Sequence, residues 1–506
     1  MSVSKRLFAG SLWCVLDGWS TEIANLAIFL VMVRLLGPEE FGLIAIALVF
    51  TSVGTELFGF GVSQVLIQRR DLSPALAGTV FWLIAGLVGA LALALLTFAP
   101  ALASLFGAPD LAWLLRWLCL GALLHGLSAV PLAMLTRALR FDVIAKRSLA
   151  MIVAGGAVGI TLAAQDFGAG ALVGLHLSQA LVSTVILFGV TRYRPPLRIV
   201  PEHLRDVRRY VLGVIGNRAV GLFDERAAQF VIGLMLGPAA VGYYNVAMRL
   251  IEILTRMFVI PINQVAMPAI ARLQSDPAQV RGILKGGIAI ASLVSCPAFL
   301  GTAVVAPELV PLALGEVWLP AVLVLQILCL RGIVWPVILY GQSLLFGLGR
   351  PGRLLRINLI DLALNVATLT VAAPFGLAAV ALASSLRVLL LRWPLLGHTI
   401  GQLTGLGLRR QAALLGRALI AAGLMSGVLL ILREYLTLRF ADLTTLAMMI
   451  AAGAALYGLI VSRAYPGLTL AFQQLVVCLL RSRRAAGTRG NPPDHAPSSA
   501  GAEAAA

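Results

Sequence analysis

The chain has 506 residues, of which 60% are apolar and only 12% charged, and its formal net charge is +17. This composition excludes an ordinary soluble protein and favours a membrane protein. A strongly basic chain could instead bind nucleic acid, and the positions of the basic residues distinguish a nucleic-acid-binding protein from a membrane protein.

Apolar segments of about 20 residues, long enough to cross a bilayer, recur from one end of the chain to the other. They are continuous and lack the alternation of strands, and lipid leaves backbone groups no outside partner, so helices are expected. We predict an all-α polytopic membrane protein with about 14 transmembrane helices. The predicted spans are 11–33, 42–66, 76–98, 111–133, 148–164, 170–190, 211–235, 243–265, 283–305, 318–345, 354–373, 376–398, 414–432 and 443–461.

Basic residues fall almost entirely on one side of this predicted topology. The even-numbered connections and the span edges beside them hold 21 Lys and Arg, whereas the odd-numbered connections hold only Arg34, Arg433 and Arg439. By the positive-inside rule, both termini are predicted to be cytoplasmic. The positive charge therefore reports topology, and no nucleic-acid partner is expected.

An internal repeat divides the chain. The segment Leu36–Leu43 (LGPEEFGL) and the segment Leu236–Tyr243 (LGPAAVGY) share Leu-Gly-Pro and a second Gly in register. Leu118–Leu120 matches Leu328–Leu330, and Phe167–Gly168 matches Phe375–Gly376, at nearly the same offset. A parallel repeat of this kind is typical of transporters, which place their site where the two halves meet.

The repeat sets the predicted organisation. Two parallel six-helix repeats are followed by two extra C-terminal helices, a basic segment lying at the membrane surface and a tail of disordered composition. The predicted boundaries are a first bundle at 1–190, a cytoplasmic linker at 191–210, a second bundle at 211–398, transmembrane helices 13 and 14 at 399–465, the interfacial segment at 466–484 and the tail at 485–506.

The eighth span carries the sharpest polar pattern. At 100° per residue, five polar residues lie within about 60° of one another on a helical wheel. Charges at this depth face a cavity or a partner. Internal pairing of Glu252 with Arg249 and Arg256 is one reading, and an anion site is the other, because one carboxylate leaves two guanidiniums in excess. The stripe consists of Asn245, Arg249, Glu252, Arg256 and Asn263.

Charges on three further spans are candidates for coupling or gating. Asp17, Thr21 and Asn25 share a face of the first span, with Glu22 on another face, and Arg218 shares a face of the seventh span with Glu225. Glu56 in the second span corresponds to Arg256 at the repeat offset, so a Glu56–Arg256 pair across the bundles is predicted as a gate or as a static contact. The predicted coupling or gating residues are Asp17, Glu56, Asp224, Glu225 and Glu252.

Guanidiniums bind phosphate oxygens in bidentate fashion and stay charged, so they suit a phosphate or pyrophosphate group. The predicted substrate-binding residues are Arg218, Asn245, Arg249, Arg256 and Asn263. The five cysteines and five histidines are scattered, so no metal site is predicted. Neither a cofactor nor a catalytic residue is expected, because the short connections leave little catalytic surface outside the bilayer.

The opening of the chain resembles the polysaccharide-transporter branch of the multidrug/oligosaccharidyl-lipid/polysaccharide exporter superfamily. The residues that carry the resemblance are Val33–Gly42 (VRLLGPEEFG), Gly59–Val62 and Gln64–Arg69 (QVLIQR). Wzx-type flippases for lipid-linked oligosaccharides often read this way. The resemblance implies two six-helix bundles in a V, alternating access and a cargo of short glycan on undecaprenyl pyrophosphate, for exopolysaccharide, capsule or O-antigen (lipopolysaccharide) synthesis. It also implies membrane lipids, a polysaccharide polymerase and a chain-length regulator as partners.

Four alternatives stay open from the sequence. A multidrug or cation antiporter of the same superfamily would have a cavity dominated by acids, and a peptidoglycan-precursor flippase would take a related cargo. A polytopic glycosyltransferase or polymerase is disfavoured by the short connections, and a scaffold subunit by the buried charged stripes. The enzyme class is therefore rejected.

Overall fold

The structure is a computed structural model. It describes residues 21–60, 66, 73–196, 201–264, 266–437 and 442–464, with side chains for all of these except 58, 60, 201–215, 217, 437 and 464. Every regular element within these ranges is a helix, which confirms the all-α prediction. Asp17, the predicted interfacial segment and the predicted tail lie outside the described residues.

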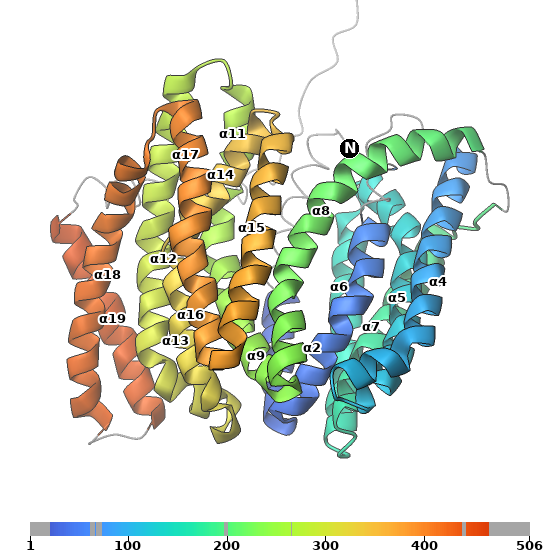
Figure 1. Cartoon of the computed structure of the whole chain (residues 1–506), viewed down its shortest axis with the longest axis horizontal. Helices are drawn as coiled ribbons and strands as arrows, with labels where there is room; N and C mark the ends of the chain where they lie inside the picture. The colour runs from blue at the N-terminus through green and yellow to red at the C-terminus, as the bar shows by residue number, and fades with distance from the viewer. Residues whose placement is uncertain are drawn as a thin grey trace, which may run out of the picture.

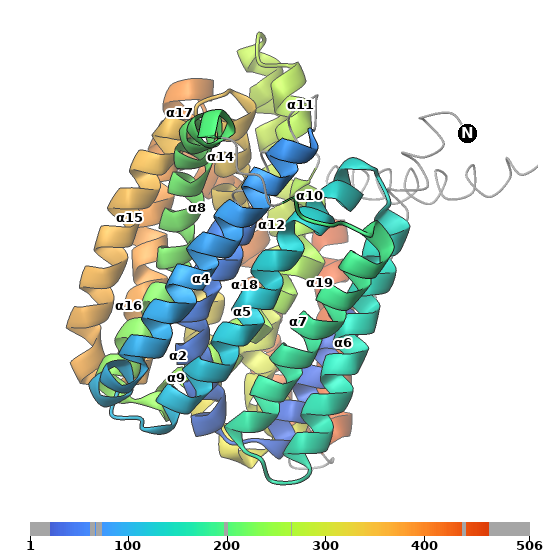
Figure 2. The ribbon, with the colours of Figure 1, turned by 90° about the vertical axis from the view of Figure 1, so that its right-hand side faces the viewer.

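The helices form two groups that stand side by side (Figure 1). The first group contains a helix at 21–35, α2 (Pro38–Ser52), the π-helix η1 (Val53–Phe60), α4 (Pro74–Leu105), α5 (Asp110–Arg137), α6 (Phe141–Ala163) and α7 (Ala169–Thr191). Seen from the side of this group, α4, α5, α6 and α7 stand in front of the rest of the molecule (Figure 2).

The second group begins with α8 (Pro201–Leu236), so the later part of the predicted linker is helical. It continues with α9 (Pro238–Leu254), the π-helix η2 (Thr255–Val259), α10 (Ile260–Asn263), α11 (Ala266–Arg272), α12 (Pro277–Leu314), η3 (Glu316–Trp318), α13 (Pro320–Gly332) and α14 (Trp335–Gly347). It ends with α15 (Pro351–Ala372), η4 (Ala373–Phe375), α16 (Leu377–Arg387), the π-helix η5 (Val388–Arg392) and α17 (Trp393–Thr404), followed by the outlying pair α18 (Leu408–Thr437) and α19 (Asp442–Ala464).

The number of membrane spans differs from the prediction of fourteen. Among the described residues, 11 helices are long and apolar enough to cross a membrane, or 12 if the bent pair α13 and α14 is one span. That pair bends by 48°, just before Pro336, whose ring cannot continue a regular helix. Two described helices fall outside the count: the one at 21–35, which is too short over its described residues, and α8, whose charged centre lowers its hydropathy.

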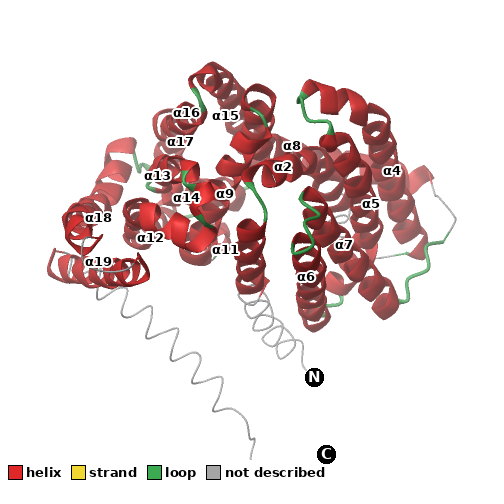
Figure 3. Ribbon diagram, turned by 90° about the horizontal axis from the view of Figure 1, so that it is seen from below, coloured by secondary structure: helices red, strands yellow, loops and turns green. Residues whose placement is uncertain are grey.

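The repeated Leu-Gly-Pro motif marks the place where the two groups cross. Helices α2 and α9 lie side by side between the groups (Figures 1 and 3). A Cβ on Gly42 would stand 1.7 Å from the Pro238 carbonyl oxygen, and a Cβ on Gly242 would stand 1.9 Å from that of Pro38. Each repeated glycine is therefore required so that the backbone of the other half can approach.

Further contacts join the two groups at the same end of the molecule. The Trp318 indole donates to the Val33 carbonyl oxygen at 3.0 Å, and its ring meets Phe41 and Tyr243 edge to face. Arg34 Nε donates to the Ala313 carbonyl oxygen at 3.0 Å and so satisfies an orphan acceptor at the end of α12. This end, near Pro38 and Pro238, is sealed by packing that is mostly apolar.

Candidate functional site

A cavity of about 760 Å³ lies against the second group of helices, within the volume range of small-molecule sites. Its lining comes from α8, α9, η2, α10, α12, α13, α14, α15 and η5, all of them in the second group. Four guanidiniums and three carboxylates line it: Arg218, Arg256, Arg331, Arg392, Asp224, Glu225 and Glu252. The cavity is therefore asymmetric between the halves, although its charged side chains reach across to the first group.

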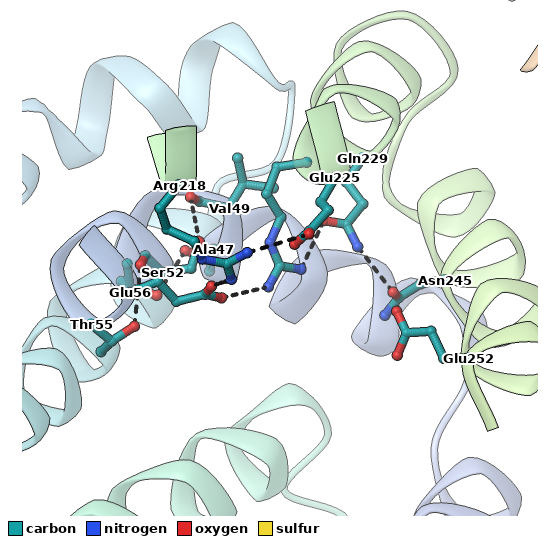
Figure 4. Close-up of polar contacts among 12 residues, drawn as sticks. Ala47, Val49, Ser52, Thr55, Glu56, Arg218, Glu225, Gln229, Asn245 and Glu252 are labelled. Atoms are coloured by element: carbon teal, nitrogen blue, oxygen red, sulfur yellow. Dashed lines mark hydrogen bonds and ion pairs between the residues drawn. The ribbon is translucent and has the colours of Figure 1, made fainter. Parts of the chain in front are cut away.

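The first cross-group contact centres on Glu56 in the π-helix η1 (Figure 4). Its carboxylate forms an ion pair with Arg218 and lies 3.8 Å from Arg226, both on α8. Arg218 also lies 3.4 Å from Glu225, which follows two turns later on the same face of α8. The predicted shared face of Arg218 and Glu225 is thus seen as a contact.

A hydrogen-bonded chain leads from this ion pair into the second group. Arg226 donates to the Gln229 side-chain oxygen at 3.2 Å, and Gln229 donates to the Asn245 side-chain oxygen at 3.0 Å. The amide of Asn245 is therefore engaged between α8 and α9 and does not line the cavity. Asn263, at the other end of the predicted stripe, donates to the Ser343 hydroxyl at 3.1 Å and also lies outside the cavity lining.

The second cross-group contact centres on Glu22, in the helix at 21–35. Its carboxylate lies 3.7 Å from Arg249 and 3.4 Å from Arg256. Arg249 also pairs with Glu252 on its own helix at 3.4 Å. The internal pairing is therefore present, and both guanidiniums also face a carboxylate of the other half. The anion site stays a prediction.

The predicted Glu56–Arg256 pair is wrong for this structure, because each partner is engaged elsewhere. Equivalent positions of a parallel repeat meet only close to the axis that relates the halves, as Gly42 and Gly242 do. In addition, π-helical turns at Val53–Phe60 and Thr255–Val259 change the angle per residue, so a wheel at 100° misplaces the side chains there.

A buried quartet of charges adjoins the cavity: Asp224 on α8, Asp361 on α15, Arg387 on α16 and Arg392 at the end of η5. Arg392 lies 3.0 Å from Asp224 and 2.8 Å from Asp361, and Arg387 forms an ion pair with Asp361. Asn365 donates to Asp224 at 2.7 Å. Asp224, predicted to couple or gate, is therefore held in a network whose other carboxylate, Asp361, is only 2% exposed.

Sequence reasoning missed the quartet as a unit. The i, i+4 spacing of Asp361 and Asn365 and the mid-span position of Arg387 were available signals. Arg392 lies near the end of its predicted span, where a side chain that reaches the membrane surface is the usual expectation. The structure instead turns it inward. No group of three or more metal-ligating side chains is present in the described ranges.

Comparison with known proteins gives one family match and several relatives. The family described as "Polysaccharide biosynthesis protein" matches residues 31–323. The lipopolysaccharide biosynthesis protein WzxC of Escherichia coli is 25% identical over 66% of this chain and 68% of its own length. The succinoglycan biosynthesis transport protein ExoT of Rhizobium meliloti is 26% identical over 64% of this chain and 66% of its own length.

Two solved structures share the fold. The lipid II flippase MurJ, in an inward closed conformation, aligns with a TM-score of 0.73 at 14% identity, over 90% of this chain and 99% of its own. An inward-facing multidrug resistance MATE family transporter of the MOP superfamily aligns with a TM-score of 0.57 at 18% identity, over 78% of this chain and 95% of its own. At these identities the likeness establishes the fold alone.

Proposed function

Because the chain belongs to the polysaccharide biosynthesis protein family, we propose that it is a flippase that moves an undecaprenyl-pyrophosphate-linked oligosaccharide across the bacterial inner membrane. The resemblance read from the opening of the sequence is thereby confirmed at the level of the family. The relatives named above are a lipopolysaccharide biosynthesis protein and a succinoglycan transport protein, which supports a glycan cargo for exopolysaccharide, capsule or O-antigen synthesis.

The observation that carries the proposal is the cavity and its guanidiniums. Arg218 and Arg256 line the cavity from α8 and η2, and Arg249 lies one helical turn from Glu252, which also lines it. Pyrophosphate oxygens are held well by several guanidiniums in a partly desolvated site. A drug or cation antiporter would need carboxylates in excess, whereas the cavity lining holds four guanidiniums against three carboxylates.

The proposed cycle uses the observed closure. With both termini cytoplasmic, the sealed end near Pro38 and Pro238 faces the periplasm, so this conformation receives cargo from the inside. The pyrophosphate binds at the guanidiniums, the glycan occupies the cavity and the lipid chain remains in the bilayer. Rearrangement of the two bundles then opens the other end. Transport of this kind makes and breaks no covalent bond, and a polymerase and a chain-length regulator are the proposed downstream partners.

The test is transport by the purified full chain in proteoliposomes. The probe is undecaprenyl pyrophosphate bearing a short fluorescent glycan, whose exposure to an impermeant quencher reports flipping. We expect Arg249→Ala and Arg256→Ala each to lower the flipping rate by about tenfold or more, because each removes a charge-assisted contact to the pyrophosphate. Protein levels in the membrane should stay near those of the unaltered chain.

Arg272→Ala is the matched control, since Arg272 is exposed at the end of α11 and away from the cavity lining. Normal flipping by both the Arg249→Ala and the Arg256→Ala variants would refute the anion site. Failure of both to accumulate would support a structural role for the ion pairs instead. Equal flipping of a fluorescent phosphatidylcholine would contradict selectivity for the pyrophosphate-linked cargo.

A further inference from the structure

Two described carboxylates of the first half, Glu22 and Glu56, each lie against two guanidiniums of the second half. Glu56 contacts Arg218 and Arg226 on α8, and Glu22 contacts Arg249 and Arg256 on α9 and η2. Glu225 and Glu252 contact the same arginines but from the arginines' own helices. Among the described residues, Glu22 and Glu56 are therefore the carboxylates that link one half to the other through these arginines.

Most of these cross-half contacts are long for charge-assisted hydrogen bonds, which usually measure about 2.7–2.9 Å. Three of the four contacts measure 3.4–3.8 Å, and the Glu22 Oε1 atom is buried without a hydrogen-bond partner. The side chain of Arg256 remains 52% exposed while it faces Glu22. The guanidiniums thus keep donors free for a second anion at the same place.

We propose that Glu22 and Glu56 are internal counter-anions, which occupy the arginine pairs in the absence of cargo and are displaced by the pyrophosphate. The inference rests on the proposed function, because it takes pyrophosphate as the competing anion. On a helical wheel, Glu22 lies on a different face from Asp17, Thr21 and Asn25. Its proposed role as a counter-anion therefore comes from the structure alone.

Displacement couples binding to movement. A ligand shifts a conformational equilibrium only by its difference in affinity for the two states. A pyrophosphate that takes the guanidiniums from Glu22 and Glu56 releases the links that hold the halves together at the centre. The state in which Glu22 and Glu56 hold the arginines therefore binds cargo weakly, and the state in which they have let go binds it well. This difference in affinity favours separation of the halves at the centre of the molecule.

The first experiment measures binding of inorganic pyrophosphate to the full chain in nanodiscs by isothermal titration calorimetry. Removing a competing carboxylate should tighten binding, so Glu22→Gln and Glu56→Gln are each expected to bind about 5-fold more tightly or better, the lower range of typical coupling between sites. Glu22→Asp keeps the charge and should return the affinity toward that of the unaltered chain. Arg249→Ala should bind more weakly.

The second experiment measures the distance between the halves by electron spin resonance, with labels at positions 140 and 350 in a cysteine-free background. These exposed positions correspond in the two repeats. Pyrophosphate should shift the distance distribution of the parent chain, and Glu22→Gln with Glu56→Gln should produce the same shift without it. Glu252→Gln is the matched control, because it removes a carboxylate from Arg249 without severing a link between the halves, and its distribution should stay that of the parent.

The outcomes separate the two ideas. If Arg249→Ala weakens pyrophosphate binding while both glutamine variants bind no more tightly and leave the distances unchanged, the counter-anion inference is wrong and the anion site stands. If pyrophosphate binds neither the parent chain nor the glutamine variants, both are wrong. Should the double variant not fold, each single glutamine variant with its aspartate partner carries the same comparison.

Discussion

The two halves of the molecule meet in two regions that are built differently. At the sealed end, α2 and α9 cross backbone to backbone at Gly42 and Gly242, and Trp318 packs against Phe41 and Tyr243. At the centre, the halves meet through Glu22 and Glu56 with four arginines. Apolar close packing offers a ligand nothing to replace, whereas an ion pair can be exchanged for another anion.

The difference shows how one pair of halves combines a firm contact with a changeable one. The crossing depends on shape, which leaves few alternative arrangements in a close-packed interior. The central contacts depend on charge and are partly open to water, where a single pair contributes at most about 1 kcal/mol. Substitutions in each region test this difference.

Gly42→Leu should break the crossing. Its side chain would meet the Pro238 carbonyl, a backbone atom that cannot turn aside. We expect a loss of stability above about 3 kcal/mol, the upper range for overpacked cores, and a sharp drop in folded protein on fluorescence-detected size exclusion. Gly86→Leu on α4 is the control, since a Cβ there meets nothing within 4 Å. Equal behaviour of the two variants would contradict the close approach.

Asp361→Ala tests whether a buried ion pair contributes more to stability than the partly exposed ion pairs of Glu22 and Glu56. It leaves Arg387, whose side chain is only 5% exposed, without its main partner, and such a change commonly costs about 3–5 kcal/mol. Glu56→Gln should lower the melting temperature far less, because Glu56 and Arg218 are 29% and 37% exposed, while it should still impair transport. Thermal unfolding of the two variants in detergent gives the comparison.

The double variant Asp361→Leu with Arg387→Leu serves as the control for that experiment. Replacing both partners by apolar residues removes the uncompensated charge, so it should be milder than Asp361→Ala. A double variant as unstable as the single one would mean that the quartet contributes through its shape and hydrogen bonds to Asp224 rather than through charge balance.

Trp318→Phe should weaken the sealed end by one interaction. The ring contacts with Phe41 and Tyr243 are kept, but the hydrogen bond to Val33 is lost, which corresponds to about 1 kcal/mol. We expect a small fall in melting temperature. We also expect a small rise in the rate at which impermeant thiol reagents, added on the sealed side, label a cysteine substituted for Gln342 in the cavity lining. Trp113→Phe, at a ring that is 47% exposed, should change neither quantity.

Single-cysteine labelling at positions near Pro38 and Pro238, outside the crossing itself, has the smallest expected effect on the protein and tests the predicted topology. Both positions should react with impermeant reagents from outside, and Arg69 and Arg205 replaced in the same way should react from inside. Labelling of both positions near the prolines from the cytoplasmic side would overturn the parallel repeat in its predicted orientation.

The repeat was the strongest signal in the sequence, and the structure gives it a physical meaning. Gly42 and Gly242 recur because each lets the backbone of the other half approach. Only glycine has no Cβ, so this requirement is visible in the sequence. The middle of the stripe, on α9 and η2, was also predicted correctly as a face, since Arg249, Glu252 and Arg256 lie close together. The ends of the stripe were predicted wrongly as cavity residues, because Asn245 and Asn263 form hydrogen bonds with Gln229 on α8 and Ser343 on α14. A helical wheel of one span cannot show contacts with other helices.

Hydropathy, the Leu-Gly-Pro repeat and the distribution of basic residues are local or periodic properties of the chain, so they were enough to predict the helical class, the family and one orientation. Which charges meet depends on the three-dimensional arrangement of the helices. Glu56 faces Arg218 rather than Arg256, Glu22 joins the site and Arg392 turns inward. The reason is that ion pairing between helices depends on their crossing, on the axis that relates the halves and on π-helical turns, none of which follows from spacing along one helix.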